Sequence, residues 1–243
     1  MEILLITGVI VFLASTSQAC TGFGFSVMAT PFFLLVYDIH DAIQINIILS
    51  IFISILMIKK IWRDIDKDLF VSLLKGGIIG LPIGILVYIF LDVKYLKIAI
   101  SIIILVLTFL LILNMRISQT RGRDLFSGGI SGLLTSSIGM PGPPLLLYFT
   151  GVGVEKAILR STALGFYVFI YSSSLAMQIF FDGTSKNIWL ASLISIPIVL
   201  LGIFLGQHLF KRINQKMFSI ITYAILFITG LYLLVTSSGI SLW

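Results

Sequence analysis

Charged side chains are scarce in this sequence. Only 11% of its 243 residues are Asp, Glu, Lys or Arg, whereas a soluble domain has about 25%. Hydrophobic residues make up 58%, and an excess of this size has to face lipid. A spanning helix needs about 20 mostly apolar residues, so this length allows about six to eight spans and no soluble domain.

Metal-ligating and redox-active side chains are also few. One cysteine, Cys20, excludes an intramolecular disulfide framework and a cysteine-rich metal site, and two histidines, His40 and His208, argue against zinc. No phosphate-binding Gly-x-x-x-x-Gly-Lys-Ser/Thr loop occurs, which argues against nucleotide hydrolysis. The acidic residues avoid the middle of every apolar run, so no constellation for a membrane-embedded enzyme emerges. We therefore expect a protein without cofactors that is not an enzyme.

The net charge of +6 comes from short clusters of Lys and Arg between apolar runs. This arrangement indicates membrane topology and not a nucleic-acid partner. The first 19 residues superficially resemble a signal peptide ending at a lipidated cysteine. No basic residue precedes the apolar stretch, however, and the apolar character resumes after Cys20. We interpret the stretch as the first membrane element.

Apolar runs long enough to span a bilayer predict six ordinary helices, at residues 42–58, 69–91, 98–113, 161–181, 188–209 and 218–235. Glycine and proline interrupt two further apolar stretches, at residues 3–37 and 125–151. As one helix the second stretch would measure about 40 Å, too long for one crossing of a core of about 30 Å and too short for two. We expect a re-entrant hairpin of two half-helices; the alternative is that glycine and proline only kink or pack a helix.

The two interrupted stretches match each other. Aligning Gly24 with Gly139 also aligns Asn46 with Ser161, at a constant shift of 115 residues. At a shift of 122, Gly80 and Gly84 of a later helix align with Gly202 and Gly206, and the four-residue spacing of these glycines is typical of close helix packing. The match predicts an internal repeat, with residues 1–120 as the first membrane repeat and residues 121–243 as the second.

Charge discriminates between two topologies. With eight full spans, nine of the 16 basic residues lie on one side of the membrane and seven on the other, which favours neither orientation. With two hairpins that return to their own side they divide into thirteen and three (13 + 3 = 16), as the positive-inside rule requires. Three spans and one hairpin per half make the repeats inverted, the plan of many secondary transporters. The predicted fold is therefore an all-α integral membrane protein of two inverted repeats.

The two breaks are the candidate sites for chemistry. The first reads Gln-Ala-Cys-Thr-Gly-Phe-Gly-Phe-Ser over residues 18–26, and the second reads Ser-Ser-Ile-Gly-Met-Pro-Gly-Pro-Pro over residues 136–144. A half-helix that starts at such a break points free N–H groups and the positive end of its dipole into the membrane interior. The pattern predicts an anion site made largely from backbone.

These motifs resemble a known family. The run 128–162, which contains Gly-Met-Pro-Gly-Pro-Pro-Leu-Leu-Leu-Tyr and Ala-Ile-Leu-Arg-Ser-Thr, is similar to the second signature of the TauE/SafE sulfite exporter family. The stretch 21–42, with Thr-Gly-Phe-Gly-Phe, resembles the first signature, and the resemblance extends over essentially the whole chain. It implies a carrier that exports sulfite, sulfonates or related anions through a path lined by both signatures. It also implies a multi-pass protein of a prokaryotic inner membrane.

We expect a small anion as substrate, bound near the midplane between the two broken helices. An anion channel and a carrier of another small organic anion remain the alternatives, and a homo-oligomer is possible. Arg160 is either an anion ligand or a positive-inside anchor, and Asn46 and Ser161 are either ligands or packing residues. For proton coupling the only candidate is His40, a weak one. The candidate substrate-binding residues are Thr21, Gly22, Phe23, Gly24, Ser26, Asn46, Ser137, Gly139, Gly142, Arg160 and Ser161.

Overall fold

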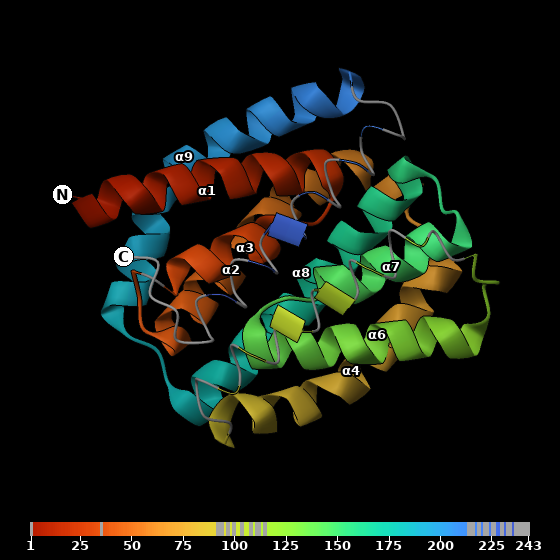
Figure 1. Ribbon diagram of the computed structural model, residues 1–243, viewed down its shortest axis with the longest axis horizontal. Helices are drawn as coiled ribbons and strands as arrows, with labels where there is room; N and C mark the ends of the chain where they lie inside the picture. Colours follow the sequence, from red (N-terminus) through yellow and green to blue (C-terminus); the bar gives the residue numbers. More distant parts are fainter. Residues whose placement is uncertain are drawn as a thin grey trace.

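A computed structural model describes residues 2–34, 36–90 and 116–212, together with isolated positions between 95 and 113 and between 217 and 235. The described ranges are helical and contain no strand (Figure 1). In order, the elements are α1 (Glu2–Thr21), α2 (Phe25–Phe33), α3 (Ile39–Ile61), the short 3₁₀ helix η1 (Trp62–Asp64), α4 (Lys67–Phe90), α6 (Arg121–Ile138), α7 (Gly142–Val152), α8 (Lys156–Asp182) and α9 (Lys186–Arg212).

Four of the described helices, α3, α4, α8 and α9, are long and apolar enough to cross a bilayer. They contain the predicted runs 42–58, 161–181 and 188–209, and residues 69–90 of the predicted run 69–91. The all-helical membrane architecture is thereby confirmed. The two other predicted spans, 98–113 and 218–235, lie for the most part outside the described residues.

The first interrupted stretch turns back on itself. The chain leaves α1 at Thr21, passes through Gly22 and Gly24 at positive φ, and starts α2 at Phe25. Helix α2 packs against α1, and the hydroxyls of Thr7 and Tyr37 lie 3.0 Å apart. The end of the stretch therefore returns to the level at which it began.

The second interrupted stretch does the same. Tyr148 of α7 donates to the carboxylate of Asp124 in the first turn of α6, with the oxygens 2.6 Å apart. The amide of Ile117, before α6, donates to the carbonyl of Gly151 at the end of α7 (2.8 Å). The arms of both hairpins are unequal, because α1 and α6 have 20 and 18 residues whereas α2 and α7 have 9 and 11. At 1.5 Å per residue the first arms are about 27–30 Å long, more than half a membrane.

Hydrogen bonds define the two ends of the helix bundle. At the end that we call the Lys60 end, Lys60 of α3 donates to Gln207 of α9 (3.2 Å), and Ser161 of α8 donates to the carbonyl of Asp64 in η1 (2.8 Å). At the opposite end, which we call the His40 end, α3 begins where α4 and α8 finish. Helix α1 runs away from the His40 end and α6 runs toward it, so the two long arms point in opposite directions along the bundle.

Each long hairpin arm packs on a glycine-bearing helix of the other half. A Cβ on Gly76, Gly80 or Gly84 of α4 would lie 1.9–2.1 Å from a backbone carbonyl oxygen of α6. On α9, a Cβ at Gly202 would lie 1.9 Å from the Ser15 hydroxyl of α1, and one at Gly206 would lie 2.5 Å from the Thr16 carbonyl. The predicted role of these glycines in close helix contact is confirmed.

Candidate functional site

Hydrogen bonds from its own residues shape the first break. The hydroxyl of Thr21 lies within hydrogen-bond distance of the carbonyls of Ser17 and Phe23, and the amide of Phe23 donates back to it. Gly24 precedes α2 with φ 114°, a conformation that side-chain-bearing residues rarely adopt. Phe25, Ser26 and Val27 follow, and each carries an N–H that has no acceptor inside its helix.

Neighbouring helices hold the second break. Helix α6 ends at Ile138 and is capped by Gly139, which has φ 69°, and the amide of Met140 donates back to the carbonyl of Leu134 (3.1 Å). The side-chain amide of Asn46, on α3, donates to the Gly139 carbonyl at 2.8 Å. Helix α7 then begins with Gly142, Pro143 and Pro144. Because proline has no N–H, only the first of these three residues is a backbone donor.

The starts of the two short helices meet. A Cβ on Gly142 would lie 3.5 Å from Cβ of Phe23 and 3.9 Å from a methyl of Val27. The positive ends of the α2 and α7 dipoles thus lie in one place inside the bundle. Residues at this meeting point are shielded from the exterior: Phe23, Ser26 and Met140 are each at most 4% exposed.

One face of α8 lines this meeting point with polar groups that the sequence reading missed. Tyr167, Tyr171, Ser174 and Gln178 recur every three or four residues and are at most 2% exposed. The hydroxyl of Tyr171 lies 3.4 Å from the Gly139 carbonyl and close to the hydroxyls of Ser26 and Ser50. The signal was present in the sequence, since these polar residues repeat with helical spacing in an otherwise apolar run.

Several buried polar atoms at this place have no hydrogen-bond partner among the described residues. The Tyr167 hydroxyl is one of them, and it would lie 3.4 Å from a Cβ on Gly142. The others are the amide oxygens of Asn46 and Gln178 and the hydroxyl of Ser50. Each buried polar group left unsatisfied costs about 1–3 kcal/mol, so such groups in a native structure call for an explanation such as a ligand.

All the predicted site residues except Gly22 and Arg160 fall into two groups. Phe23, Gly24, Ser26, Asn46, Gly139 and Gly142 lie at or beside the two breaks. The others serve local structure: Thr21 bonds within its own turn, Ser137 donates to the Leu133 carbonyl (2.8 Å), and Ser161 donates toward η1 at the Lys60 end.

Arg160 and Gly22 touch each other. A Cβ on Gly22 would lie 2.7 Å from Cα of Arg160. The guanidinium donates to the carbonyl of Ala19 in the last turn of α1 and lies 4.2 Å from the ring centroid of Phe210. A cation is favourable at the carbonyl end of a helix. Arg160 therefore ties α8 to α1 and α9, while its Nε has no partner.

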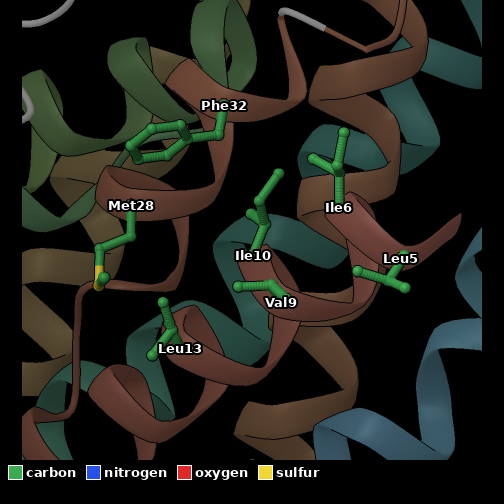
Figure 2. Close-up of a pocket in the computed structure, with 7 residues that line it drawn as sticks. All are labelled: Leu5, Ile6, Val9, Ile10, Leu13, Met28 and Phe32. Atoms are coloured by element: carbon green, nitrogen blue, oxygen red, sulfur yellow. The ribbon is translucent and has the colours of Figure 1, made fainter. Parts of the chain in front are cut away.

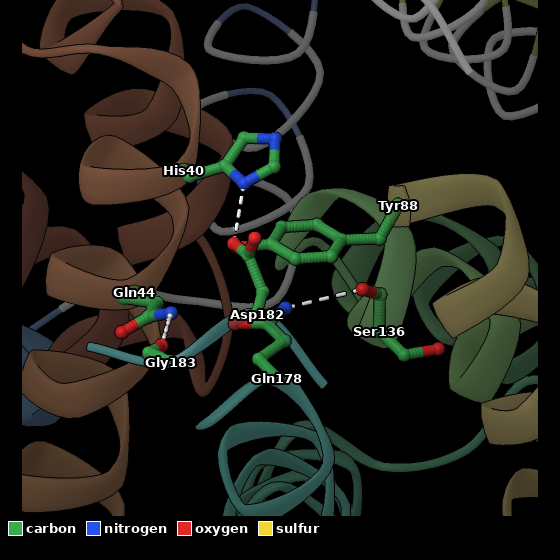
Figure 3. Close-up of polar contacts among 7 residues, drawn as sticks. All are labelled: His40, Gln44, Tyr88, Ser136, Gln178, Asp182 and Gly183. Carbon is green, nitrogen blue, oxygen red and sulfur yellow. Dashed lines mark hydrogen bonds and ion pairs between the residues drawn. The ribbon is translucent and has the colours of Figure 1, made fainter. Parts of the chain in front are cut away.

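A second polar cluster lies at the His40 end (Figure 3). Nδ1 of His40 is 2.5 Å from a carboxylate oxygen of Asp182, and the Tyr88 hydroxyl donates to the same oxygen at 3.0 Å. The His40 and Asp182 side chains are 41% and 34% exposed. Gln44 and Gln178 continue inward from this cluster, with Gln178 donating to the Ser136 carbonyl near the second break (3.1 Å). The cluster joins α3, α4 and α8.

Two largely apolar grooves lie between the hairpin arms. The groove between α1 and α2, of about 310 Å³, is lined by Leu5, Ile6, Val9, Ile10, Leu13, Met28 and Phe32 (Figure 2). The groove between α6 and α7, of about 280 Å³, includes Phe126, Ile130 and Leu147, Pro144 of the second break, and the polar residues Arg123, Ser127 and Tyr148. The apolar walls of the first groove fit hydrocarbon and not an anion.

Comparison with known families covers nearly the whole chain. The model of the family described as sulfite exporter TauE/SafE matches residues 7–233, which include α3, α4, α8, α9, the second hairpin and all but the first residues of α1 in the first hairpin. The chain belongs to the sulfite exporter TauE/SafE family. Comparison with curated proteins and with solved structures gave no match. Membership of the TauE/SafE family makes this a multi-pass membrane protein of a family that transports sulfite or related anions.

Proposed function

We propose that the protein is a secondary transporter that exports a small sulfur-containing anion, which binds where the two helix breaks meet. The observation that carries the proposal is the contact of Gly142 with Phe23 and Val27, because it brings the starts of α2 and α7 together. Two helix N-termini that converge inside a membrane favour a negative charge between them. The family supplies the chemical class of the anion.

Inverted repeats are part of the proposal. We match α1 with α6, α2 with α7, α3 with α8 and α4 with α9. Each pair of contacting helices then corresponds to a pair that is also in contact. Under this match the α4 and α6 pair corresponds to the α9 and α1 pair, and the α3 and α9 pair to the α8 and α4 pair. This correspondence supports a first repeat over residues 1–120 and a second over residues 121–243. The contacts of Thr7 with Tyr37 and of Tyr148 with Asp124 favour two hairpins over eight full spans.

Charge supports an orientation with the Lys60 end in the cytoplasm of a prokaryotic cell. Lys186 alone among the described basic residues lies near the His40 end, and Lys75 lies within α4. The remaining ones lie at the Lys60 end: Lys59, Lys60, Arg63, Lys67, Arg116, Arg121, Arg123, Lys156, Arg160, Lys211 and Arg212. Cytoplasmic ends carry the excess of Lys and Arg in inner-membrane proteins.

The test is flux of labelled sulfite and of a labelled sulfonate in proteoliposomes that contain the purified protein. Leucine at Gly24 or Gly139 would block the site but also strain a positive-φ position. Gly142→Ala is cleaner, because its new methyl group meets atoms at 3.4 Å or more and enters the space beside Tyr167. Gly122→Ala is the matched control, since nothing lies within 4 Å of its added Cβ.

Saturable exchange in wild type and Gly122→Ala, with a raised KM in Gly142→Ala, supports the carrier and its site. Unitary conductance without saturation would make the protein an anion channel instead of a carrier. No flux of any sulfur anion above empty vesicles would overturn the substrate assignment. Equal KM values in Gly142→Ala and Gly122→Ala would overturn the location of the site.

A further inference from the structure

The two short helices differ in the donors that they bring to the site. Helix α2 begins with three residues that carry an N–H, whereas α7 begins with one such residue and two prolines. A backbone-only site of the kind expected from the sequence would therefore be one-sided. On the α7 side, side chains have to provide the remaining donors.

Tyrosine hydroxyls of α8 occupy that side. The unpartnered hydroxyl of Tyr167 lies next to Gly142 at the start of α7. The hydroxyl of Tyr171 lies next to Ser26 in the first turn of α2 and 3.4 Å from the Gly139 carbonyl. The two rings are 5.5 Å apart between centroids. Tyr167 thus brings an unpartnered donor to the start of α7, whereas the Tyr171 hydroxyl already donates to the Gly139 carbonyl.

The groups around these hydroxyls are neutral. Residues 42–58 of α3, all of α2 and α7, and residues 161–181 of α8 contain no Asp, Glu, Lys or Arg. The nearest charge along α8 is Arg160, seven residues before Tyr167 and about 10 Å away along the helix axis. Among the described residues, the anion would therefore meet dipoles and a hydroxyl donor, and the nearest cation would be Arg160, which touches Gly22 and already donates to the Ala19 carbonyl.

A site of this kind discriminates by charge. The cost of moving an ion from water into a medium of low dielectric constant grows with the square of its charge, while the attraction of dipoles grows only in proportion to the charge. Doubling the charge therefore raises the cost fourfold and the gain about twofold. A monovalent anion is stabilised under conditions in which a divalent one is excluded.

We infer that the site binds a monovalent oxyanion, a sulfonate or hydrogensulfite, and that the Tyr167 hydroxyl is a direct hydrogen-bond donor to it. The inference rests on the proposed function, because it concerns the same site between the hairpins. It adds the charge class of the substrate, which excludes sulfate and the fully ionised form of sulfite. It also adds a ligand, Tyr167, that lies outside both family-like signatures.

The experiment compares three anions in proteoliposomes: methanesulfonate, which is monovalent on both sides of neutrality, sulfate, which is divalent, and sulfite, which changes from divalent to monovalent as the pH falls through neutrality. Methanesulfonate should saturate the carrier at a KM that does not vary with pH. Sulfite should be carried better at the acidic side, in proportion to its hydrogensulfite fraction, and sulfate should neither be carried nor compete. Transport of sulfate as good as that of methanesulfonate would overturn the charge class.

The variants test the ligand. Loss of a hydrogen bond to a charged group costs about 1.5–3 kcal/mol, so Tyr167→Phe should raise the KM for methanesulfonate about 10- to 100-fold without lowering the maximal rate to the same extent. Tyr171→Phe should change the KM less, because the Tyr171 hydroxyl already donates to the Gly139 carbonyl. Tyr95→Phe is the control, because Tyr95 is 63% exposed. An unchanged KM in folded Tyr167→Phe would overturn the assignment of Tyr167.

A binding measurement separates this inference from the proposed function. If no anion crosses the membrane, thermal unfolding of the detergent-purified protein is followed with methanesulfonate or sulfate added. Stabilisation by methanesulfonate alone, lost in Tyr167→Phe, would support the monovalent site while the transport claim fails. Absence of any shift would overturn both.

Discussion

The tips of the two hairpins are held in different ways. The first tip has two glycines at positive φ, and its shape comes from its own Thr21 hydroxyl and from the close approach of Arg160 to Gly22. The second tip has one such glycine and is held from outside by Asn46 and by the hydroxyl of Tyr171. The first tip is therefore shaped by a bond within its own turn and by contact with Arg160 of α8, and the second tip by hydrogen bonds from α3 and α8. We expect the second tip to follow any movement of both helices.

The long arms of the hairpins, α1 and α6, also differ in how they pack on their neighbours. Glycines on both sides bring α4 and α6 into backbone contact, since Cβ atoms on Gly128 and Gly132 of α6 would also meet carbonyls of α4 at 2.1–2.2 Å. The contact of α1 with α9 uses mainly glycines of α9, against Ser15 and Ala19 side chains as well as backbone, while Gly8 of α1 meets only the end of the Ile198 side chain, at 3.1 Å. In the α4 and α6 pair a backbone carbonyl faces Gly76, Gly80 and Gly84 at 1.9–2.1 Å, so this pair is the more rigid of the two.

The largest effect is expected within the α4 and α6 contact. The methyl group of Gly80→Ala would lie 2.0 Å from the Gly129 carbonyl oxygen, and a backbone atom in a packed helix pair cannot yield. We expect the free energy of unfolding to fall by more than about 3 kcal/mol, seen as loss of a monodisperse protein in detergent.

Gly129→Ala is the control on the same interface. Its methyl group would lie 3.6 Å from the nearest atom, the Gly76 carbonyl oxygen, and it should change stability by no more than about 1 kcal/mol, in the favourable direction. Equal damage by Gly80→Ala and Gly129→Ala would contradict the packing described.

The corresponding change in the other half should be milder. In Gly202→Ala the closest atom is the Ser15 hydroxyl, at 1.9 Å, and a hydroxyl can rotate away, although the Ser15 Cβ remains at 2.9 Å. We expect a loss of about 1–3 kcal/mol in stability, measured by thermal unfolding in the same detergent. If Gly202→Ala proves more damaging than Gly80→Ala, the α1 and α9 contact is the more rigid one.

A smaller effect distinguishes the second tip from an ordinary helix end. Gly139 and Gly153 both end helices at positive φ, 69° and 80°, so alanine at either position carries a conformational cost of about 1–2 kcal/mol. At Gly139 the methyl group would also lie 2.7 Å from the Asn46 side-chain nitrogen, whereas at Gly153 nothing lies within 4 Å. Gly139→Ala should therefore be the more destabilising.

A double variant isolates the contact with Asn46. Asn46→Ala should cost less stability in the Gly139→Ala background than in wild type, because the clash is relieved. Additive losses would show that Asn46 does not press on the second tip.

The smallest effect is expected at the His40 end. Asp182→Asn removes the charge that faces His40, but both side chains are more than a third exposed. An ion pair that water screens contributes at most about 1 kcal/mol. Thermal unfolding of Asp182→Asn should therefore stay close to wild type, and a larger loss would mean that this cluster fastens α3 to α8 more strongly than its exposure implies.

The sequence predicted the membrane class, the long described helices and the positions of both breaks, because apolar length, glycine and proline act locally. It predicted the glycine contacts of α4 and α9 for the same reason. It did not predict that the first arms are longer than half a membrane, since arm length depends on where the tip meets its neighbours. Nor could spacing alone reveal that Ser161 donates toward η1, which is a contact between distant segments.

The site was predicted in part. Gly24, Gly139 and Gly142 were identified from the breaks themselves, whereas Tyr167 and Tyr171 were overlooked because a tyrosine in an apolar helix is usually a packing residue. The role of Tyr167 emerges only from the partner that its hydroxyl lacks and from its approach to Gly142. Arg160 was expected as an anion ligand or a positive-inside anchor. In this structure its guanidinium donates to the Ala19 carbonyl and so links α8 to α1.

The most direct test of the central claim, that the anion binds between the hairpin tips, is substrate protection of an introduced cysteine. In a Cys20→Ser background, Ser26→Cys puts a thiol in the first turn of α2, and Gly122→Cys puts one in open space at the Lys60 end. A charged thiol reagent is then applied to proteoliposomes with and without methanesulfonate. The account predicts slower labelling at position 26 with methanesulfonate and an unchanged rate at position 122; equal rates at position 26 with and without the anion would contradict it.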